Sequence, residues 1–341
     1  MNSRDLITAA AQGKSTPRPP IWLMRQAGRY MSEYQSLRKK YSFMELCHQP
    51  DLATEITLQP MKTFGMDAAI LFCDILVTAE ALGRDLDIVE KKGPVIGNPV
   101  RSEKDLNELL PKDAALENLG YVSTTLRQIR EGIGAEKALL GFVGAPFTVG
   151  SYMIEGGSSS SVPVTFKMIA EAPELFKKIM TRLTDLTIDY IQLQRDAGVD
   201  ALQIFESWAS ILPEAIYLEH VFPHLKRIVE TCQNPDQPLI LFALATPSLW
   251  QTLGQLPAQV LSIGPEHDLA QFRKAFPDKA LQGNLDTRWL LCDQPTLIRE
   301  ANIVLDKMAG QPGHIFNLGH GITPNVPVDQ VRTLVDLVQA R

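Results

Sequence analysis

Asp67-Ala68-Ala69-Ile70-Leu71-Phe72-Cys73-Asp74 is an uninterrupted apolar run with a carboxylate at each end. Such a run is typical of a strand that is buried on both faces of a parallel sheet. Seven further short apolar runs occur along the chain, at Ile21–Met24, Ala138–Val143, Asp200–Phe205, Pro238–Ala243, Gln259–Ile263, Ala280–Gln282 and His314–Asn317. Helical stretches separate them, so we predict an α/β fold in which a single domain over residues 1–341 forms a (β/α)8 TIM-type barrel. An open doubly wound sheet is the alternative, but no G-x-G-x-x-G follows any run.

The intervals between these runs contain apolar residues at helical spacing. We predict helices at Leu6–Ala11, Glu33–Lys40, Pro50–Gly65, Pro173–Gly198 and Pro213–Cys232. The section from Thr78 to Glu136 is longer and more polar, with turn signals at Lys91-Lys92-Gly93-Pro94 and at Asn98-Pro99. We interpret it as an excursion that contains helices, and not as a separate domain.

Composition narrows the class of protein. The chain has 341 residues, of which 45% are hydrophobic and 21% charged, as is ordinary for a soluble enzyme. A net charge of −6 argues against a nucleic-acid surface. No apolar run is long enough to span a membrane, and the N-terminus lacks the pattern of a signal peptide. The four cysteines are scattered without a C-x-x-C, so we expect a cytoplasmic protein without membrane or nucleic-acid partners.

In a barrel of this type, function lies at the carboxyl ends of the strands. The first run leads into Met24-Arg25-Gln26-Ala27-Gly28-Arg29-Tyr30, where two arginines stand four residues apart with a glycine between them. A guanidinium is always charged and has five donors in a planar fork, so such a pair can bind carboxylates or phosphates. The alternative is a pair of solvated surface arginines.

Asp74 ends the second run, where we expect it to be partly desolvated. A lone carboxylate in that position needs donors or a cation, or its pKa rises. It is therefore a candidate acceptor for N–H groups, or a counter-charge to a cation formed during a reaction. The alternative is a cap for the following helix.

Three other strand ends supply further candidates. Tyr152 lies in the loop after the third run, Ser207 follows the fourth, and His320 stands between two glycines after the eighth. The alternatives are a packed tyrosine with a solvated hydroxyl, a helix-capping serine and a structural histidine.

Other kinds of site lack support. His220 and His224 have i, i+4 spacing, but Pro223 interrupts the turn and there is no H-E-x-x-H pattern for zinc. Glu266, His267 and Asp268 are more typical of a solvated charge cluster than of a metal site. The residues alone predict a barrel that binds a polyanionic small molecule, with no cofactor fingerprint.

Several motifs resemble the uroporphyrinogen decarboxylase family of heme biosynthesis. Besides residues 24–30 and the run from Asp67 to Val77, they are Gly93–Ile96, Gly144–Thr148, Glu155–Ser158, Gln282–Asp286 and Asn317–Ile322. They match in order and cover essentially the whole chain.

The resemblance implies a distorted barrel, a homodimer, and catalysis without a metal or organic cofactor. The implied substrate is uroporphyrinogen III, whose four acetate side chains lose CO2 to give coproporphyrinogen III. The implied catalytic residues are Asp74, which would accept the pyrrole N–H groups, and Arg25, the family's proposed proton donor. Arg25 and Arg29 would hold substrate carboxylates with help from the backbone of Gln26, Ala27 and Gly28. The remaining substrate contacts would come from Tyr152, Ser207 and His320.

The chain departs from the family pattern at three neighbouring strand ends. Glu206 stands where the family usually has aspartate, Leu244-Ala245 where it has lysine and glycine, and Gly264-Pro265 where it has Asp-Trp. These departures leave open a diverged or non-catalytic paralogue that binds a porphyrinogen or another polyanion. A zinc-dependent corrinoid or thiol methyltransferase is a second alternative, although Cys232 and Cys292 lack the expected histidine two residues before them.

Overall fold

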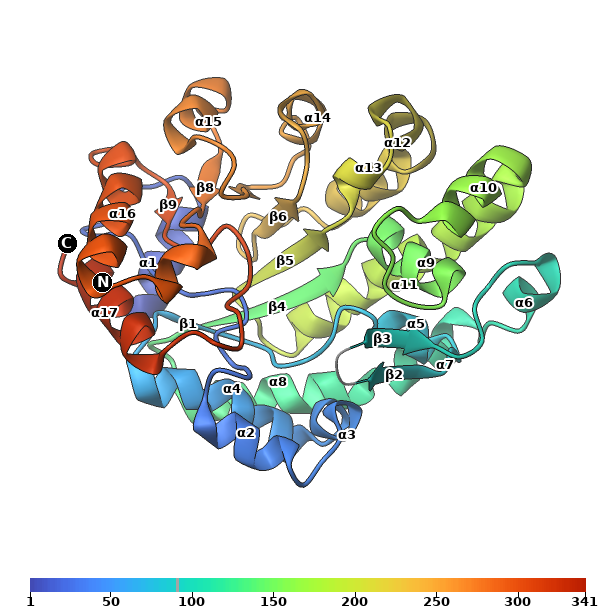
Figure 1. Ribbon diagram of the computed structural model, residues 1–341, viewed down its shortest axis with the longest axis horizontal. Coiled ribbons are helices and arrows are strands. Elements are labelled where there is room, and N and C mark those ends of the chain that lie inside the picture. The colour runs from blue at the N-terminus through green and yellow to red at the C-terminus, as the bar shows by residue number, and fades with distance from the viewer. Residues whose placement is uncertain (90–91) are drawn as a thin grey trace.

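A computed structural model describes residues 1–89 and 92–341, and its centre is a curled sheet of parallel strands (Figure 1). Within the described chain the sheet has seven strands, in the order β1-β4-β5-β6-β7-β8-β9. They are β1 (Ala68–Ile70), β4 (Ala138–Gly144), β5 (Ala201–Glu206), β6 (Leu239–Ala243), β7 (Val260–Ser262), β8 (Ala280–Gln282) and β9 (His314–Ile315). Every pairing is parallel, so all carboxyl ends lie at one face, which we call the mouth; the opposite end is the base. The predicted α/β barrel class is confirmed.

The predicted first strand is wrong in extent. Of the run Ile21–Met24, only Ile21 forms a parallel bridge, to Phe316 beside β9. The Phe316 N–H donates to Pro20 O (2.9 Å), and the Asp67 N–H donates to Ile21 O (2.9 Å). Residues 20–21 thus connect the two edges of the sheet. The ladder stops there because the N–H of Met24 donates to the Asn317 side chain instead (3.0 Å).

Helices surround the outer face of the sheet in Figure 1. The first part of the chain contains α1 (Ser3–Ala11), α2 (Ser32–Arg38), α3 (Phe43–His48), α4 (Pro50–Phe64), α5 (Val77–Ala81), α6 (Glu103–Asn107), α7 (Lys112–Asn118) and α8 (Gly120–Ile133). The rest contains α9 (Pro146–Glu155), α10 (Pro163–Glu171), α11 (Pro173–Asp196), η1 (Ala209–Ile211), α12 (Glu214–His220), α13 (Phe222–Thr231), α14 (Pro247–Leu253), α15 (Leu269–Ala275), η2 (Thr287–Leu291), α16 (Gln294–Lys307) and α17 (Val328–Gln339).

Four of the five predicted helices match α1, α2, α4 and α11, and the fifth is wrong. The stretch Pro213–Cys232 forms two helices, α12 and α13, instead of one. Pro223 lies in the first turn of α13, where its missing N–H is tolerated, and it cannot continue α12.

A small hairpin interrupts the section that we predicted to be an excursion with helices. Antiparallel strands β2 (Leu86–Val89) and β3 (Gly93–Ile96) form a separate two-stranded sheet, which the sequence analysis missed. The predicted turn at Lys91–Pro94 begins outside the described residues. Val95 of β3 also forms an antiparallel bridge to Gly157, so the hairpin packs against the segment that follows α9.

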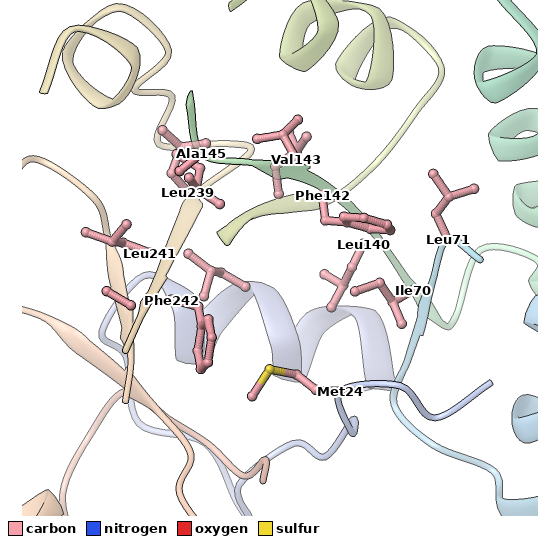
Figure 2. Close-up of a cluster of buried hydrophobic side chains, with 14 of the residues drawn as sticks. Met24, Ile70, Leu71, Leu140, Phe142, Val143, Ala145, Leu239, Leu241 and Phe242 are labelled. Carbon is pink, nitrogen blue, oxygen red and sulfur yellow. The ribbon is translucent and has the colours of Figure 1, made fainter. Parts of the chain in front are cut away.

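The interior of the curled sheet is apolar near the strands and also contains a polar network. Figure 2 shows Met24 among side chains from β1, β4 and β6, all belonging to one buried cluster. Close by, the Gln282 amide accepts from Trp22 Nε1 (3.0 Å) and donates to Gln203 Oε1 and Ser262 Oγ (both 2.8 Å). These four side chains are fully buried, and each bond satisfies a polar group that would otherwise be costly to bury.

Two carboxylates at the base are fully paired. Asp67, before β1, accepts hydrogen bonds from Arg18 (2.7 and 2.8 Å), from Ser3 Oγ (2.7 Å) and from the Ile21 N–H (2.8 Å). Burial alone would raise the pKa of Asp67, but the bonds from Arg18 and Ser3 outweigh it and lower the pKa. Asp200, before β5, accepts from Arg4 (2.8 Å), Arg130 and the Leu139 N–H (2.7 Å). The base therefore ties α1 and α8 to the sheet.

Candidate active site

Arg25 lies at the mouth on a tight turn that Gln26 holds in place. The Leu23 N–H donates to Gln26 Oε1 (3.0 Å), the Gln26 N–H donates back to Leu23 O (2.9 Å), and Gln26 Nε2 donates to Ala68 O of β1 (3.0 Å). Arg25 itself has φ 63°, a left-handed conformation that non-glycine residues adopt only at a cost of about 1–2 kcal/mol. Because the backbone leaves the extended conformation at Arg25, its side chain points in a different direction from that of a residue in a strand.

The loop after β9 is bonded to the same segment. Met24 accepts from the Ile322 N–H (2.9 Å) and donates to Asn317 Oδ1 (3.0 Å), so residues 317–322 lie beside Arg25. A Cβ at Gly321 would overlap Cγ and Cδ of Arg25. Glycine at this position is therefore what allows the Arg25 side chain to lie across the loop that contains His320.

Asp74 lies close to Arg25 without pairing with it. Its Oδ1 accepts from the Leu76 N–H (2.8 Å). This bond resembles the helix cap that the sequence analysis gave as the alternative role of Asp74. Burial raises the pKa of Asp74, and the Leu76 N–H and the nearby Arg25 charge oppose that rise only in part. Among the described residues, no ion pair within 4.0 Å joins the two side chains. The carboxylate is thus poorly neutralised by the protein, which leaves it able to accept donors from a ligand.

The charge of Arg25 is also left largely uncompensated. Burial and the neighbouring Arg29 lower the pKa of Arg25, while Asp74 and Tyr152 act in the opposite direction. The Arg29 side chain is exposed and forms no hydrogen bond to the described part of the protein. Two adjacent guanidiniums without protein partners form an anion-binding arrangement.

Tyr152 and Ser207 come from neighbouring elements, α9 and the end of β5. The Tyr152 ring stacks on the Trp208 indole, with centroids 4.3 Å apart and planes 29° from parallel. Burial raises the pKa of Tyr152. The Ser207 N–H donates to Thr148 Oγ1 of α9 (3.0 Å), and this bond fixes the start of the loop.

His320 lies near Arg25, on the loop after β9. Its pKa is lowered, first by burial and then by the charge of Arg25, and the carboxylate of Glu266 acts against this shift. A neutral imidazole offers one donor and one acceptor to a ligand at neutral pH.

The mouth thus brings together Arg25, Asp74, Tyr152 and His320, which influence one another electrostatically, while Arg29 adjoins Arg25. Gln26 does not join them, since its side chain is buried and its N–H is used within the turn. Ala27 and Gly28 are half-buried, with N–H groups that form no hydrogen bond within the described chain.

One polar residue at the mouth escaped the sequence analysis as a functional candidate. Glu206, the last residue of β5, is fully buried, and its Oε1 accepts from Thr148 Oγ1 (2.6 Å). Burial raises the pKa of Glu206 to about 7. A carboxylate at a strand end was the available signal, the same one that singled out Asp74.

The departures after β6 and β7 have local structural consequences. Leu244 donates its N–H to Glu206 O (3.2 Å) and accepts from the Ser210 N–H (3.1 Å), so its backbone extends the edge of the mouth. The carboxylate of Glu266 folds over Gly264 and occupies the space that a Cβ there would need. Glu266 also pairs with His267 (3.2 Å).

Neither a metal centre nor a membrane segment is found in the described residues. No three His, Cys, Asp or Glu side chains there are grouped so that they could hold a metal ion. None of the helices described is long and apolar enough to cross a membrane.

A curled parallel barrel whose mouth presents unpaired guanidiniums, a carboxylate, a phenol and an imidazole defines a class of enzymes that act on anionic small molecules. The comparisons with known proteins identify the family. The chain belongs to the uroporphyrinogen decarboxylase (URO-D) family, whose model matches residues 2–341.

The similar sequences are curated uroporphyrinogen decarboxylases. Those of Thermus thermophilus and Gloeobacter violaceus are each 40% identical, and that of Desulfotalea psychrophila is 42% identical. These matches cover 98–99% of this chain and 97–98% of the relatives. A methyltransferase from Methanosarcina mazei has a similar structure, with a TM-score of 0.84 at 18% identity over 100% of this chain and 99% of its own. That likeness shows the fold alone.

Proposed function

We propose that this chain is a cofactor-independent carboxy-lyase that removes CO2 from the four acetate side chains of uroporphyrinogen III to give coproporphyrinogen III. The observation that carries the proposal is the unpaired Asp74 beside Arg25, at the mouth of a chain about 40% identical to uroporphyrinogen decarboxylases. We further propose that it folds as one domain over residues 1–341 and acts as a cytoplasmic homodimer in heme biosynthesis.

The reaction requires a proton donor and a group that stabilises a cationic intermediate. Protonation of the α-carbon of the pyrrole ring, next to the carbon that bears the acetate, gives an iminium ion that is conjugated with the acetate-bearing carbon. The C–C bond to the carboxylate then breaks, its electron pair neutralises the iminium nitrogen, and CO2 leaves. Protonation of the resulting exocyclic methylene, with loss of the proton from the ring carbon, gives a methyl group. Each cycle consumes one proton per CO2.

Asp74 would accept the pyrrole N–H groups and stabilise the iminium charge. Its raised pKa indicates that the protein alone stabilises this carboxylate poorly, so a developing cation beside it gains a strong interaction. Arg25 is the proposed proton donor, and its lowered pKa favours that role. Arg25 and Arg29 would also bind substrate carboxylates, together with the N–H groups of Ala27 and Gly28. Tyr152, Ser207 and His320 would contact the remaining carboxylates or the macrocycle.

The experiment is anaerobic incubation with uroporphyrinogen III, followed by oxidation of the products and their separation by carboxylate number. The proposal predicts species with seven, six, five and four carboxylates in succession. Substrate that binds without turnover would contradict it, and would favour the non-catalytic paralogue that the altered ends of β6 and β7 suggest.

A further inference from the structure

We propose that Glu206 is a positioning residue, which through Thr148 holds Ser207 and the Tyr152–Trp208 ring pair in the arrangement that binds substrate, and that loss of its proton draws the neighbouring donors towards the carboxylate and so displaces them from that arrangement. This inference rests on the proposed function, because it concerns the binding role of the same mouth. Glu206 is not expected to touch the substrate itself, since its side chain is fully buried.

The first step is the hydrogen-bond chain that runs from Glu206 to the substrate-binding loop. The Thr148 hydroxyl donates to Glu206 Oε1 (2.6 Å) and accepts from the Ser207 N–H (3.0 Å). Thr148 and Glu206 have no solvent exposure. One hydroxyl therefore joins the end of β5 to the first turn of α9, and its orientation depends on the Glu206 carboxyl group.

The second step is the ring pair on either side of this chain. Tyr152 stands one helical turn beyond Thr148 on α9, and Trp208 directly follows Ser207. Their rings stack at 4.3 Å between centroids. Because each ring is on an element that the Glu206–Thr148 bond connects, the spacing of the pair follows the state of that bond.

The third step is that the environment of Glu206 suits a neutral carboxyl group. Its Oε2 and the Tyr217 hydroxyl of α12 are both buried, and neither has a well-formed hydrogen bond to the described residues. The groups that act on the carboxyl are Thr148 from α9, the Trp208 N–H from the loop and the Tyr217 hydroxyl from α12. None of them is charged at neutral pH, because burial raises the pKa of Tyr217 well above its ordinary value.

The fourth step is the consequence of ionisation. Burial raises the pKa of Glu206 to about 7, so the proton leaves within the physiological range. A buried carboxylate without a counter-charge must draw donors towards it or admit water. Thr148, the Trp208 N–H and Tyr217 are the donors in reach, and their movement would disturb the Ser207 loop and the ring pair.

The experiment measures KM and kcat for uroporphyrinogen III between pH 6.5 and 8.5 in the wild type, in Glu206→Gln and in Glu219→Gln, a control on the exposed face of α12. The wild type and the control should show KM rising about fivefold across this range with kcat little changed, as expected when positioning alone is lost. Glu206→Gln, which keeps the neutral shape, should show a flat KM. His320 does not produce this effect, since its pKa is lowered from 6.5 and it titrates below the range. A KM with the same pH dependence in Glu206→Gln as in the wild type would overturn the inference.

A substrate-free arm separates this inference from the proposed function. The emission of Trp208, taken as the difference between the wild type and Trp208→Phe, should change with a midpoint near pH 7. The change should persist on the Glu219→Gln background and vanish on that of Glu206→Gln. If the wild type fails to decarboxylate but shows this titration, the proposed function fails and the positioning role of Glu206 stands. If Trp208 emission does not titrate, the inference fails.

A second pair of variants keeps the test decisive if Glu206→Gln does not fold. Thr148→Ser retains the bridging hydroxyl, and Thr148→Val replaces it with a methyl group of similar volume. The inference predicts a KM near that of the wild type for the serine variant and a KM raised at every pH for the valine variant. Equal KM values in the two variants would contradict it.

Discussion

Carboxylates at the two ends of the same strands differ in whether a cation pairs with them. At the base, Asp67 and Asp200 precede β1 and β5 and are paired with Arg18 and with Arg4 and Arg130. At the mouth, Asp74 follows β1 and Glu206 ends β5; neither has a cation within 4.0 Å in the described chain, and the pKa of each is raised. Arg4, Arg18 and Arg130 at the base are paired with carboxylates, whereas Arg25 and Arg29 at the mouth form no ion pair within the described chain.

This difference supports our proposal that the base stabilises the fold and that the mouth acts on a ligand. Removing either partner of a buried, fully hydrogen-bonded ion pair strongly destabilises the folded protein, because the other charge stays buried without compensation. Unpaired buried groups cost stability, and they persist where a ligand or a reaction uses them. Substitutions at the base should therefore change the free energy of unfolding, and those at the mouth should change KM and kcat.

The largest effect on stability should come from Asp67. Asp67→Asn leaves Arg18 without its partner, and we expect it to cost about 3–5 kcal/mol. Asp74→Asn should cost nothing or increase stability at pH 7, because the folded protein raises the pKa of Asp74 and so disfavours its charge. Urea unfolding of both variants at pH 7 measures the change in the free energy of unfolding that each causes. Equal losses of stability would contradict the proposed difference between base and mouth.

The next largest effect should be the pH dependence of stability contributed by Glu206. Its folded pKa of about 7 lies above the ordinary value of 4.5, so the folded state holds a proton that the unfolded chain has lost. Stability should therefore fall as pH rises from about 4.5 through 7, by on the order of 3 kcal/mol. Urea unfolding of the wild type and of Glu206→Gln from pH 5 to 8 isolates this contribution. If the free energy of unfolding depends on pH identically in the two proteins, Glu206 does not titrate as described.

Gly321 tests whether the position of Arg25 matters. In Gly321→Ala the added methyl group overlaps the Arg25 side chain, and we expect kcat/KM to fall about 100-fold because the guanidinium is displaced. Gly120→Ala is the control, since a Cβ there meets nothing within 4 Å. Normal activity in Gly321→Ala would mean that the geometry of Arg25 is unimportant.

The smallest of these effects should come from Arg29. Arg29→Ala removes one charge-assisted contact to a substrate carboxylate and should raise KM about tenfold with little change in kcat. Arg127→Ala, on the exposed surface of α8, is the control for the loss of a positive charge. Steady-state kinetics under anaerobic conditions gives both constants. An unchanged KM would remove Arg29 from the anion site.

The strands of the barrel could be predicted because buried parallel strands are continuous apolar runs, and seven of the eight runs became strands. Ile21–Met24 has the same composition, but the Asn317 side chain takes the Met24 N–H and Arg25 turns to positive φ, which are tertiary effects. The split between α12 and α13 was signalled by Pro223. The hairpin of β2 and β3 is short and half-exposed, so its residues lack a strong apolar pattern.

The site was predictable as a set of strand ends and less so in detail. The sequence predicted that Arg25, Asp74, Tyr152 and His320 would lie near one another because they follow apolar runs whose carboxyl ends share one face, and their binding roles stay predictions. Gln26 was expected to help bind substrate through its backbone, but nothing in the sequence indicates that its N–H is used within the turn. Glu206 was treated as a departure from a family pattern, and its burial against Thr148 depends on packing between β5 and α9.

The central claim is that the mouth performs the decarboxylation and that Asp74 stabilises its cationic intermediate. The most direct measurement is CO2 release in a single turnover, with uroporphyrinogen III bound by excess enzyme, for the wild type, Asp74→Asn and Asp67→Asn. We predict that Asp74→Asn remains folded and binds substrate but releases CO2 about 100- to 1,000-fold more slowly. Under conditions where it remains folded, Asp67→Asn should release CO2 at nearly the wild-type rate. A near-normal rate in Asp74→Asn would contradict the account.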